Sequence, residues 1–171
     1  NLLWDCVALL DADTIASVWA LGGITAIAIS HPHYYTSMVE WSSVFGGVPI
    51  LIHADDKEWV QRPSEAVQFW DGHYHELADG LTLIRCGGHF PGASVLHWAG
   101  GAQGKGILLP GDTIQVCPDG KSLSFMYSYP NYIPLNAAAV RRIARAVEPL
   151  AFDRIYGAWW GRNIGDGAKP A

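Results

Sequence analysis

The chain has 171 residues, of which 50% are hydrophobic, and its 11 Lys and Arg against 16 Asp and Glu give a formal net charge of −5. This length and hydrophobic content predict one domain over residues 1–171 with one sizeable core. The acidic balance excludes a nucleic-acid partner, because binding along a nucleic-acid backbone needs many clustered Lys and Arg. No apolar run reaches the roughly 20 residues of a membrane span.

Strand and helix patterns alternate in the first half of the chain. Asn1 to Asp5 is an apolar stretch that begins without Met and resembles a strand entered from upstream, so we expect that an N-terminal segment is missing. Pairs of glycines end both helix patterns, because glycine readily takes the left-handed conformation that closes a helix. This β-α-β-α-β order favours parallel strands covered by helices. The further predicted strands are residues 24–30 and 48–53, and the predicted helices are residues 13–21 and 34–45.

Short strand patterns separated by glycine-rich turns dominate the second half. Because no helix pattern of any length separates the first three of them, these strands are expected to pair as antiparallel neighbours. Asn136 is a suitable N-cap for a helix that runs to about Glu148. The predicted strands are residues 81–86, 94–99, 106–110 and 152–159, whereas residues 55–80 are predicted to form helical and loop structure on the surface.

Arg141, Arg142 and Arg145 form a basic cluster on one side of this last predicted helix. The other side of the helix carries apolar residues that suit a core-facing stripe. The arginines are therefore interpreted as a solvated face.

Three cysteines, Cys6, Cys86 and Cys117, are widely spaced and lie in apolar surroundings. An odd number at such spacing suits reduced core thiols better than a disulfide framework. The cysteines therefore favour a cytoplasmic protein.

The strongest chemical signal is Ser30-His31-Pro32-His33, where a predicted buried strand meets a helix. Residues two apart in extended backbone point the same way, and Pro32 biases His31 away from the helical conformation, so the two imidazoles can converge. His89 and Asp112 also follow strands, and neighbouring glycines let the backbone turn sharply there and present one ligand at a loop tip. His31, His33, His89 and Asp112 are therefore candidate metal ligands.

The order of these motifs resembles the metallo-β-lactamase superfamily, whose zinc ligands come from an H-x-H-x-D-H loop, a glycine-flanked His, a Gly-Asp turn and a C-terminal Gly-His-Gly. His31 and His33 match the first two positions, His89 matches the next, and Asp112 matches the bridging aspartate. The resemblance covers residues 1–161. It implies an α/β fold, the metallo-β-lactamase-like αββα sandwich, here partial because the opening strands of the family have no counterpart in the chain.

Three positions depart from the family pattern. Tyr35 and Thr36 stand where the family has Asp and His, and Trp160 stands where the family has its C-terminal His. In the family, all three positions belong to the second metal. The resemblance therefore implies one retained metal site and a degenerate second site, in which the Trp160 indole fills the space of the second metal.

The resemblance also implies a cofactor and roles for the ligands. One zinc ion is expected, with iron or manganese as alternatives, and His31, His33 and His89 would leave a fourth position for a water whose pKa falls to about 7. Asp112 is the expected fourth ligand or the acceptor that orients this water. Tyr35 is expected to donate a hydrogen bond to an oxyanion, or, as the weaker alternative, to bind the metal as a phenolate.

The expected function is metal-dependent hydrolysis, by a metal-bound hydroxide, of a small ester, thioester, lactone or related substrate. One alternative is a catalytically degenerate relative that binds a metal or ligand without turnover, which the three departures favour. The other is an iron-dependent redox or oxygenase relative, for which a Tyr35 phenolate would be the hint. Fold analogy alone does not separate these hypotheses.

The remaining histidines are interpreted as ordinary packing or surface residues, because none shares the motif context of the candidate ligands. Several aromatic residues are interpreted as ordinary packing, since large aromatics dominate cores, with an aromatic rim over the site as the alternative. His73-Tyr74-His75 repeats the two-residue spacing of His31 and His33. Asp5 is interpreted either as a hydrogen-bond partner of a metal ligand or as a solvated capping residue. The residues interpreted as structural are His53, His73, His75, His97, Tyr127, Tyr129, Tyr132 and Trp159.

Overall fold

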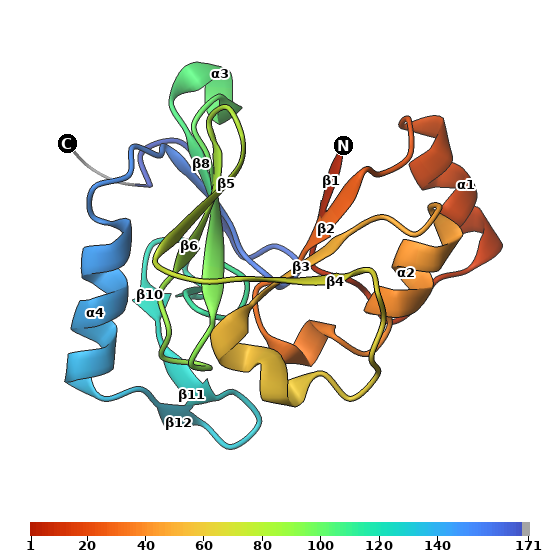
Figure 1. The fold of residues 1–171 in the computed structure, drawn as a ribbon. Helices are drawn as coiled ribbons and strands as arrows, with labels where there is room; N and C mark the ends of the chain where they lie inside the picture. The colour runs from red at the N-terminus through yellow and green to blue at the C-terminus, as the bar shows by residue number, and fades with distance from the viewer. Residues whose placement is uncertain (169–171) are drawn as a thin grey trace. The chain divides into compact units, whose positions relative to one another are not determined.

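A computed structural model of the protein describes residues 1–168. These residues form two compact units, the first spanning Asn1–Trp70 and the second beginning at Asp71. Figure 1 labels the helices and strands of both units. The sequence-based expectation of one domain stays a prediction.

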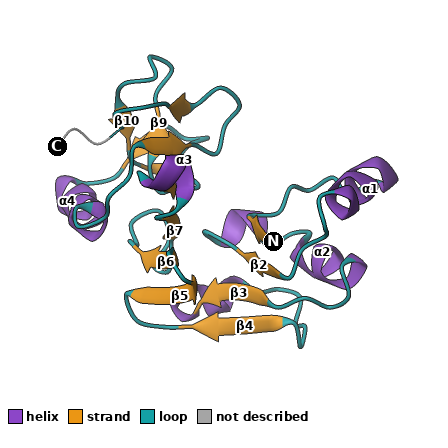
Figure 2. Cartoon of the chain, turned by 90° about the horizontal axis from the view of Figure 1, so that it is seen from above, coloured by secondary structure: helices purple, strands orange, loops and turns teal. Residues whose placement is uncertain are grey.

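The first unit contains a four-stranded parallel sheet. Its elements are β1 (Leu2–Trp4), α1 (Ala12–Ala20), β2 (Ala26–Ala28), the 3-10 helix η1 (Pro32–Tyr34), α2 (Met38–Val44), β3 (Ile50–His53), the 3-10 helix η2 (Ala54–Trp59) and β4 (Val67–Trp70). The strands lie in the order β1-β2-β3-β4. Right-handed crossovers between successive parallel strands place their helices on the same face, and Figures 1 and 2 show α1 and α2 side by side. The predicted parallel arrangement is confirmed.

Apolar side chains fill the space between this sheet and its helices. Ile27 on β2 and Ile50 and Ile52 on β3 are completely buried, and Trp41 on α2 packs in the same cluster. The Trp41 indole also donates a hydrogen bond from Nε1 to the carbonyl of Val7 at 2.9 Å. This bond ties the segment that follows β1 to α2.

The second unit is built on a six-stranded mixed sheet. Its strands are β5 (Tyr74–Ala78), β6 (Leu81–Arg85), β7 (Ser94–Trp98), β8 (Ile107–Leu109), β13 (Arg154–Tyr156) and β14 (Asn163–Ile164). Strands β5 to β8 pair as antiparallel neighbours, as predicted for β6, β7 and β8, and β13 joins β8 in parallel. The other elements are α3 (Gly101–Gly104), β9 (Gln115–Val116), β10 (Leu123–Ser124), β11 (Met126–Ser128), β12 (Ile133–Pro134) and α4 (Ala137–Val147).

Helix α4 begins and packs as its sequence predicts. The Asn136 side chain caps the helix, because its Oδ1 accepts a hydrogen bond from the backbone N–H of Ala139 at 3.0 Å. Ile143 is completely buried and packs with Ile84 and Cys86 of the β6 region. The apolar stripe of α4 therefore holds the helix against the sheet, next to the loop that follows β6.

Two predicted regions differ from the structure. Residues 55–80 contain η2, as helical structure was expected, but they also form β4 and β5. Both strands are sheet edges, where polar side chains are tolerated because one side of the strand faces solvent. The helix predicted over residues 34–45 is shorter, since η1 ends at Tyr34 and α2 begins only at Met38.

None of the described helices is both long and apolar enough to cross a membrane. Cys6, Cys86 and Cys117 are free thiols, and the first two are buried. Burial raises the pKa of both buried thiols to about 12. These two cysteines are therefore protonated core residues, as expected.

Replacing Gly88 with Ala is expected to destabilise the second unit more than Gly72→Ala does. Gly88 has a φ of +92°, and a Cβ there would lie 2.8 Å from Ile143 Cδ1 and 3.0 Å from Leu135 Cδ1. Gly72 has a φ of +83° with no heavy atom within 4 Å of a Cβ. We expect a loss of about 1 kcal/mol in the free energy of unfolding for Gly72→Ala, from backbone strain alone, and about 2–4 kcal/mol for Gly88→Ala. Urea titration measures both losses, and equal losses would contradict close packing of α4 on the loop.

Candidate metal-ligating residues

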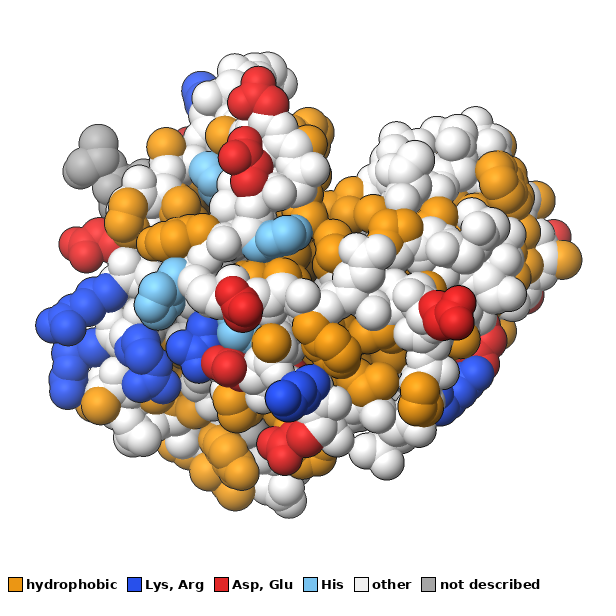
Figure 3. Space-filling view, viewed as in Figure 1, with side chains coloured by type: hydrophobic (Ala, Val, Ile, Leu, Met, Phe, Trp, Pro, Cys, Tyr) orange, Lys and Arg blue, Asp and Glu red, His pale blue; other side chains and the backbone are white. Residues whose placement is uncertain are grey.

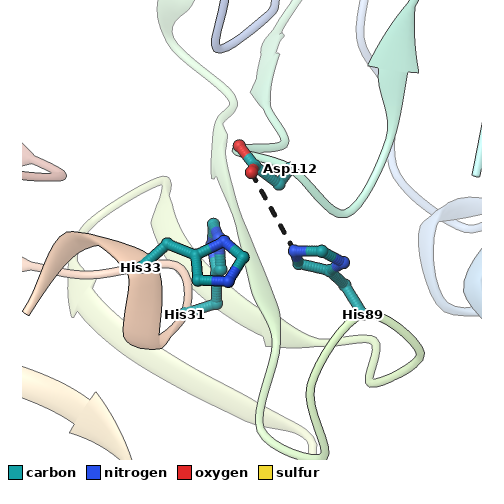
Figure 4. A group of neighbouring side chains, drawn as sticks. All are labelled: His31, His33, His89 and Asp112. Atoms are coloured by element: carbon teal, nitrogen blue, oxygen red, sulfur yellow. Dashed lines mark ion pairs between the residues drawn. The ribbon is translucent and has the colours of Figure 1, made fainter. Parts of the chain in front are cut away.

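His31 and His33 follow β2 at the point where the chain turns into η1. The backbone of His31 is extended, with φ −170° and ψ 170°, and Pro32 is the first residue of η1. The two imidazole centroids lie 4.8 Å apart with the rings at 72° (Figure 4). The short spacing therefore brings both rings together, as the sequence predicts. His31 is completely buried, whereas His33 is exposed.

A hydrogen-bond chain from Asp5 through Ser30 fixes the His31 imidazole. The Asp5 carboxylate accepts the backbone N–H of Ser30 at 2.7 Å and the Ser30 hydroxyl at 3.0 Å. Ser30 Oγ lies 2.8 Å from His31 Nδ1. Because the single hydroxyl proton goes to the carboxylate, Oγ accepts the proton of Nδ1. Nε2 of His31 then carries the lone pair that a metal ion would need.

Asp5 itself lies in a conformation that is uncommon for a residue with a side chain. Its φ is +59°, and its backbone N–H donates to the carbonyl of Ala28 at 2.9 Å. This left-handed turn directly after β1 lets one residue bind the end of β2 through its backbone and Ser30 through its carboxylate. These bonds join Asp5 to Ser30, so Asp5 acts on the candidate ligand His31 through Ser30.

In the second unit, His89 lies in the loop between β6 and β7. Gly87 and Gly88 turn the chain with φ values of +65° and +92°. The backbone N–H groups of Cys86 and Gly87 both donate to the carbonyl of Ala93 at 2.9 Å. These bonds close the loop and leave His89 at its tip.

The His89 imidazole is held by a backbone carbonyl. Its Nδ1 lies 2.9 Å from the carbonyl oxygen of Met126, which can only accept, so Nδ1 donates and Nε2 carries the lone pair. Nε2 lies 3.9 Å from Asp112 Oδ2, the pair that the dashed line joins in Figure 4. His89 is 4% exposed and Asp112 is 8% exposed. The structure therefore brings the two candidate ligands of the second unit together.

Tyr129, interpreted from the sequence as a packing residue, also positions Asp112. Asp112 follows β8 in a turn where Gly111 has a φ of +53° and the N–H of Thr113 donates to the carbonyl of Pro110. The Tyr129 hydroxyl donates to the Asp112 carbonyl at 2.7 Å, and its ring lies 5.5 Å from the His89 ring. Burial, and then the negative charge of Asp112, raise the pKa of Tyr129, so its phenol remains a donor.

The candidate ligand atoms in the described chain are nitrogens of His31, His33 and His89 and a carboxylate oxygen of Asp112. Three imidazoles and one carboxylate form a donor set that suits zinc and iron. The two buried imidazoles each have Nδ1 engaged as a donor, which leaves Nε2 as the ligand atom. The residues of both units therefore fit a metal ion chemically.

Tyr35 lies in the core of the first unit. It is 8% exposed and packs in the cluster that contains Met38 and Trp41. Burial raises its pKa above the ordinary value, and the charges of Asp56 and Asp5 raise it further. The neutral phenol is therefore the stable form here, which suits a hydrogen-bond donor better than a phenolate ligand.

The prediction that the Trp160 indole fills the space of a second metal is wrong. Trp160 is fully exposed at 102%. The reason is a tight turn, in which the N–H of Arg162 donates to the Trp159 carbonyl and the N–H of Gly157 donates to the Arg162 carbonyl. This turn directs Trp160 into solvent, while Trp159 packs against Tyr129 with their ring centroids 4.7 Å apart.

Two other buried histidines have structural partners, as expected. His53 caps η2, because its Nδ1 accepts the N–H of Asp55 at 3.1 Å, and it packs edge-on against Trp70. His97 Nε2 lies 2.7 Å from the carbonyl of Ala151.

Comparisons with known proteins identify one relative by sequence and several solved structures with a similar fold. No protein-family model matches the chain. The uncharacterized protein YmaE of Bacillus subtilis (strain 168) is 55% identical to it over 159 residues, which cover 93% of this chain and 58% of YmaE. The chain thus spans less than two thirds of the length of this relative.

Three solved structures of low sequence identity resemble the chain closely in fold. DIM-1 metallo-β-lactamase superposes with a TM-score of 0.69 at 17% identity, covering 96% of this chain and 75% of that one. A quorum-quenching N-acyl homoserine lactone lactonase gives 0.63 at 16%, covering 91% and 73%. TTHA1623 in a di-iron-bound form gives 0.65 at 16%, covering 96% and 84%. The chain is therefore a metallo-β-lactamase-fold protein, as the resemblance of its motifs predicts.

Proposed function

We propose that this protein is a metal-dependent hydrolase and that His31, His33, His89 and Asp112 bind one metal ion. The observation that carries the proposal is the way in which the two buried imidazoles are held. Ser30 Oγ takes the Nδ1 proton of His31, and the Met126 carbonyl takes that of His89. Such partners fix the tautomer and the orientation of metal-binding histidines. At both motif positions the engaged nitrogen is Nδ1, which leaves the Nε2 lone pair as the ligand atom.

Zinc is the metal that we propose first, because a set of three imidazoles and one carboxylate suits it. Iron and manganese are the alternatives, and the di-iron-bound fold neighbour supports iron. We propose one ion per chain, since Tyr35 and Thr36 stand where the family pattern has further ligands.

When bound, the metal ion would act as a Lewis acid and lower the pKa of a coordinated water to about 7. Asp112 contributes a carboxylate beside His89, either as a ligand or as the atom that accepts a proton from water. Tyr129 keeps this carboxylate in place through the Asp112 backbone. Tyr35 is protonated in the first unit and is proposed as a hydrogen-bond donor to an oxyanion.

The proposed substrate is a small molecule with an ester, thioester, lactone or related bond. The names of two fold neighbours, a β-lactamase and an N-acyl homoserine lactone lactonase, support this class. The second candidate function is metal binding without turnover. Tyr35 favours this second candidate, because the family's aspartate is replaced at that position by a phenol that packs in a core.

Metal analysis of the purified protein is expected to give about one ion per chain. His31→Ala and His89→Ala are each expected to lose the bound metal, because each variant lacks one of the four proposed ligands. The two substitutions lie in different units. If each unit bound metal by itself, either variant would retain part of the metal, which would contradict a shared ion. His73→Ala is the matched control, because His73 is exposed and outside the candidate ligands.

Ser30→Ala is expected to weaken metal affinity by about 10–100-fold, because His31 loses the acceptor that fixes its tautomer. Competition with a chromogenic chelator measures this affinity. Ser42→Ala is the control, since Ser42 is a buried serine of the same unit whose hydroxyl donates to Val48. Equal affinities of the two variants would show that Ser30 acts only on stability.

Hydrolysis of a panel of esters, thioesters and lactones tests turnover. We expect the metal-loaded protein to hydrolyse one of these classes, and His89→Ala to lose at least about a hundredfold in kcat/KM, since the metal supplies several kcal/mol of charge stabilisation. Metal binding without any turnover across the panel would favour the second candidate function. Activity that persists unchanged in His89→Ala would overturn the proposal.

A further inference from the structure

A pocket lies on the second unit between β6 and α4. Its volume is about 320 Å³, which lies in the range of pockets that hold small molecules. Ile84 and Cys86 line it from the β6 side and Arg142 and Arg145 from α4, and His73, just before β5, lies at its edge. Figure 3 shows basic side chains gathered beside α4, with histidine next to them. The candidate metal ligands do not line this pocket.

The pocket is strongly cationic in a chain whose net charge is negative. Three arginines, Arg85, Arg142 and Arg145, are among its lining residues, and none of those residues is Asp or Glu. Elsewhere arginines pair with acids, as Arg62 does with Glu40 and Arg154 with Asp166.

Arg142 and Arg145 form no such ion pair, although Glu148 lies at the end of α4, three residues after Arg145. Among the described residues, no carboxylate lies within 4 Å of either guanidinium. The two arginines are three residues apart on α4, a spacing at which like charges repel each other. A bound anion would relieve this repulsion.

The other lining residues reinforce the positive charge and leave room for a ligand. Burial raises the pKa of the Cys86 thiol, and the positive charge of the neighbouring Arg85 offsets part of this rise. Gly87 borders Arg142, because a Cβ at Gly87 would lie 3.9 Å from Arg142 Nε. The loop that follows β6 thus lies close to the Arg142 guanidinium.

We propose that this pocket binds the phosphate group of a small molecule. Guanidinium groups bind phosphate through paired, charge-assisted hydrogen bonds, and phosphate carries enough charge to match more than one arginine. The exposed His73 imidazole can add a hydrogen bond from the pocket edge. The site is separate from the proposed metal centre and does not depend on hydrolysis.

Isothermal titration of the metal-loaded 171-residue chain with inorganic phosphate at constant ionic strength tests the proposal. Arg142→Gln and Arg145→Gln are each expected to weaken phosphate binding at least about tenfold, since each removes charge-assisted hydrogen bonds. Arg141→Gln is the matched control, because Arg141 is exposed on the same helix and does not line the pocket. An equal loss in all three variants would mean a general charge effect and would overturn the site.

Two further measurements test where phosphate binds and whether the pocket prefers phosphate to other anions. His89→Ala is expected to keep the phosphate affinity, whereas binding lost in that variant and kept in Arg142→Gln would place phosphate at the metal centre and overturn the proposal. Acetate is expected to bind more weakly than phosphate, and equal binding would overturn the phosphate class. Glutamine suits helices well, so thermal unfolding without phosphate should show that all three arginine variants remain folded. Phosphate should raise the Tm of the unmodified protein and of Arg141→Gln more than that of Arg142→Gln or Arg145→Gln.

Discussion

The hydrogen bonds at Nδ1 of two buried imidazoles are the constraint on which the candidate site depends. An imidazole that is free to rotate offers either nitrogen, whereas His31 and His89 each have Nδ1 bound to a fixed oxygen. Both oxygens are held by segments remote in sequence, since Asp5 holds Ser30 and β11 carries the Met126 carbonyl. The orientation of each imidazole is therefore a tertiary property of its unit.

Much of each unit can be understood as support for these two bonds. In the first unit, β1 is followed by the left-handed turn at Asp5, whose backbone N–H donates a hydrogen bond to the end of β2. In the second unit, Ile143 fills the space beside Gly88, so that α4 supports the loop that presents His89. Each support combines a tertiary contact with a left-handed backbone residue, which is strained at Asp5 but readily adopted by glycine at Gly88.

Local sequence signals predicted those features that depend on local chemistry. The His31-Pro32-His33 spacing, the Asn136 cap and the strands over residues 81–110 needed only periodicity and turn residues. The edge strand β5 was missed because its polar residues obscure the alternation of apolar and polar side chains that is typical of a strand. Met126 was missed because a backbone carbonyl has no side-chain signature, and Trp160 was misplaced because one turn decides which of two adjacent tryptophans packs inward.

The same distinction applies to charge. Net composition excludes a large basic surface, but it averages over positions and does not reveal three arginines in one pocket. The interpretation of Arg142 and Arg145 as a solvated face accounts for their exposure, yet it leaves two like charges on one helix that form no ion pair with a described acid. Since α4 uses Ile143 to hold the His89 loop and its arginines to line the pocket, one helix has two separable roles. Substituting Arg142 changes the charge of the pocket and leaves the contact between Ile143 and the loop intact.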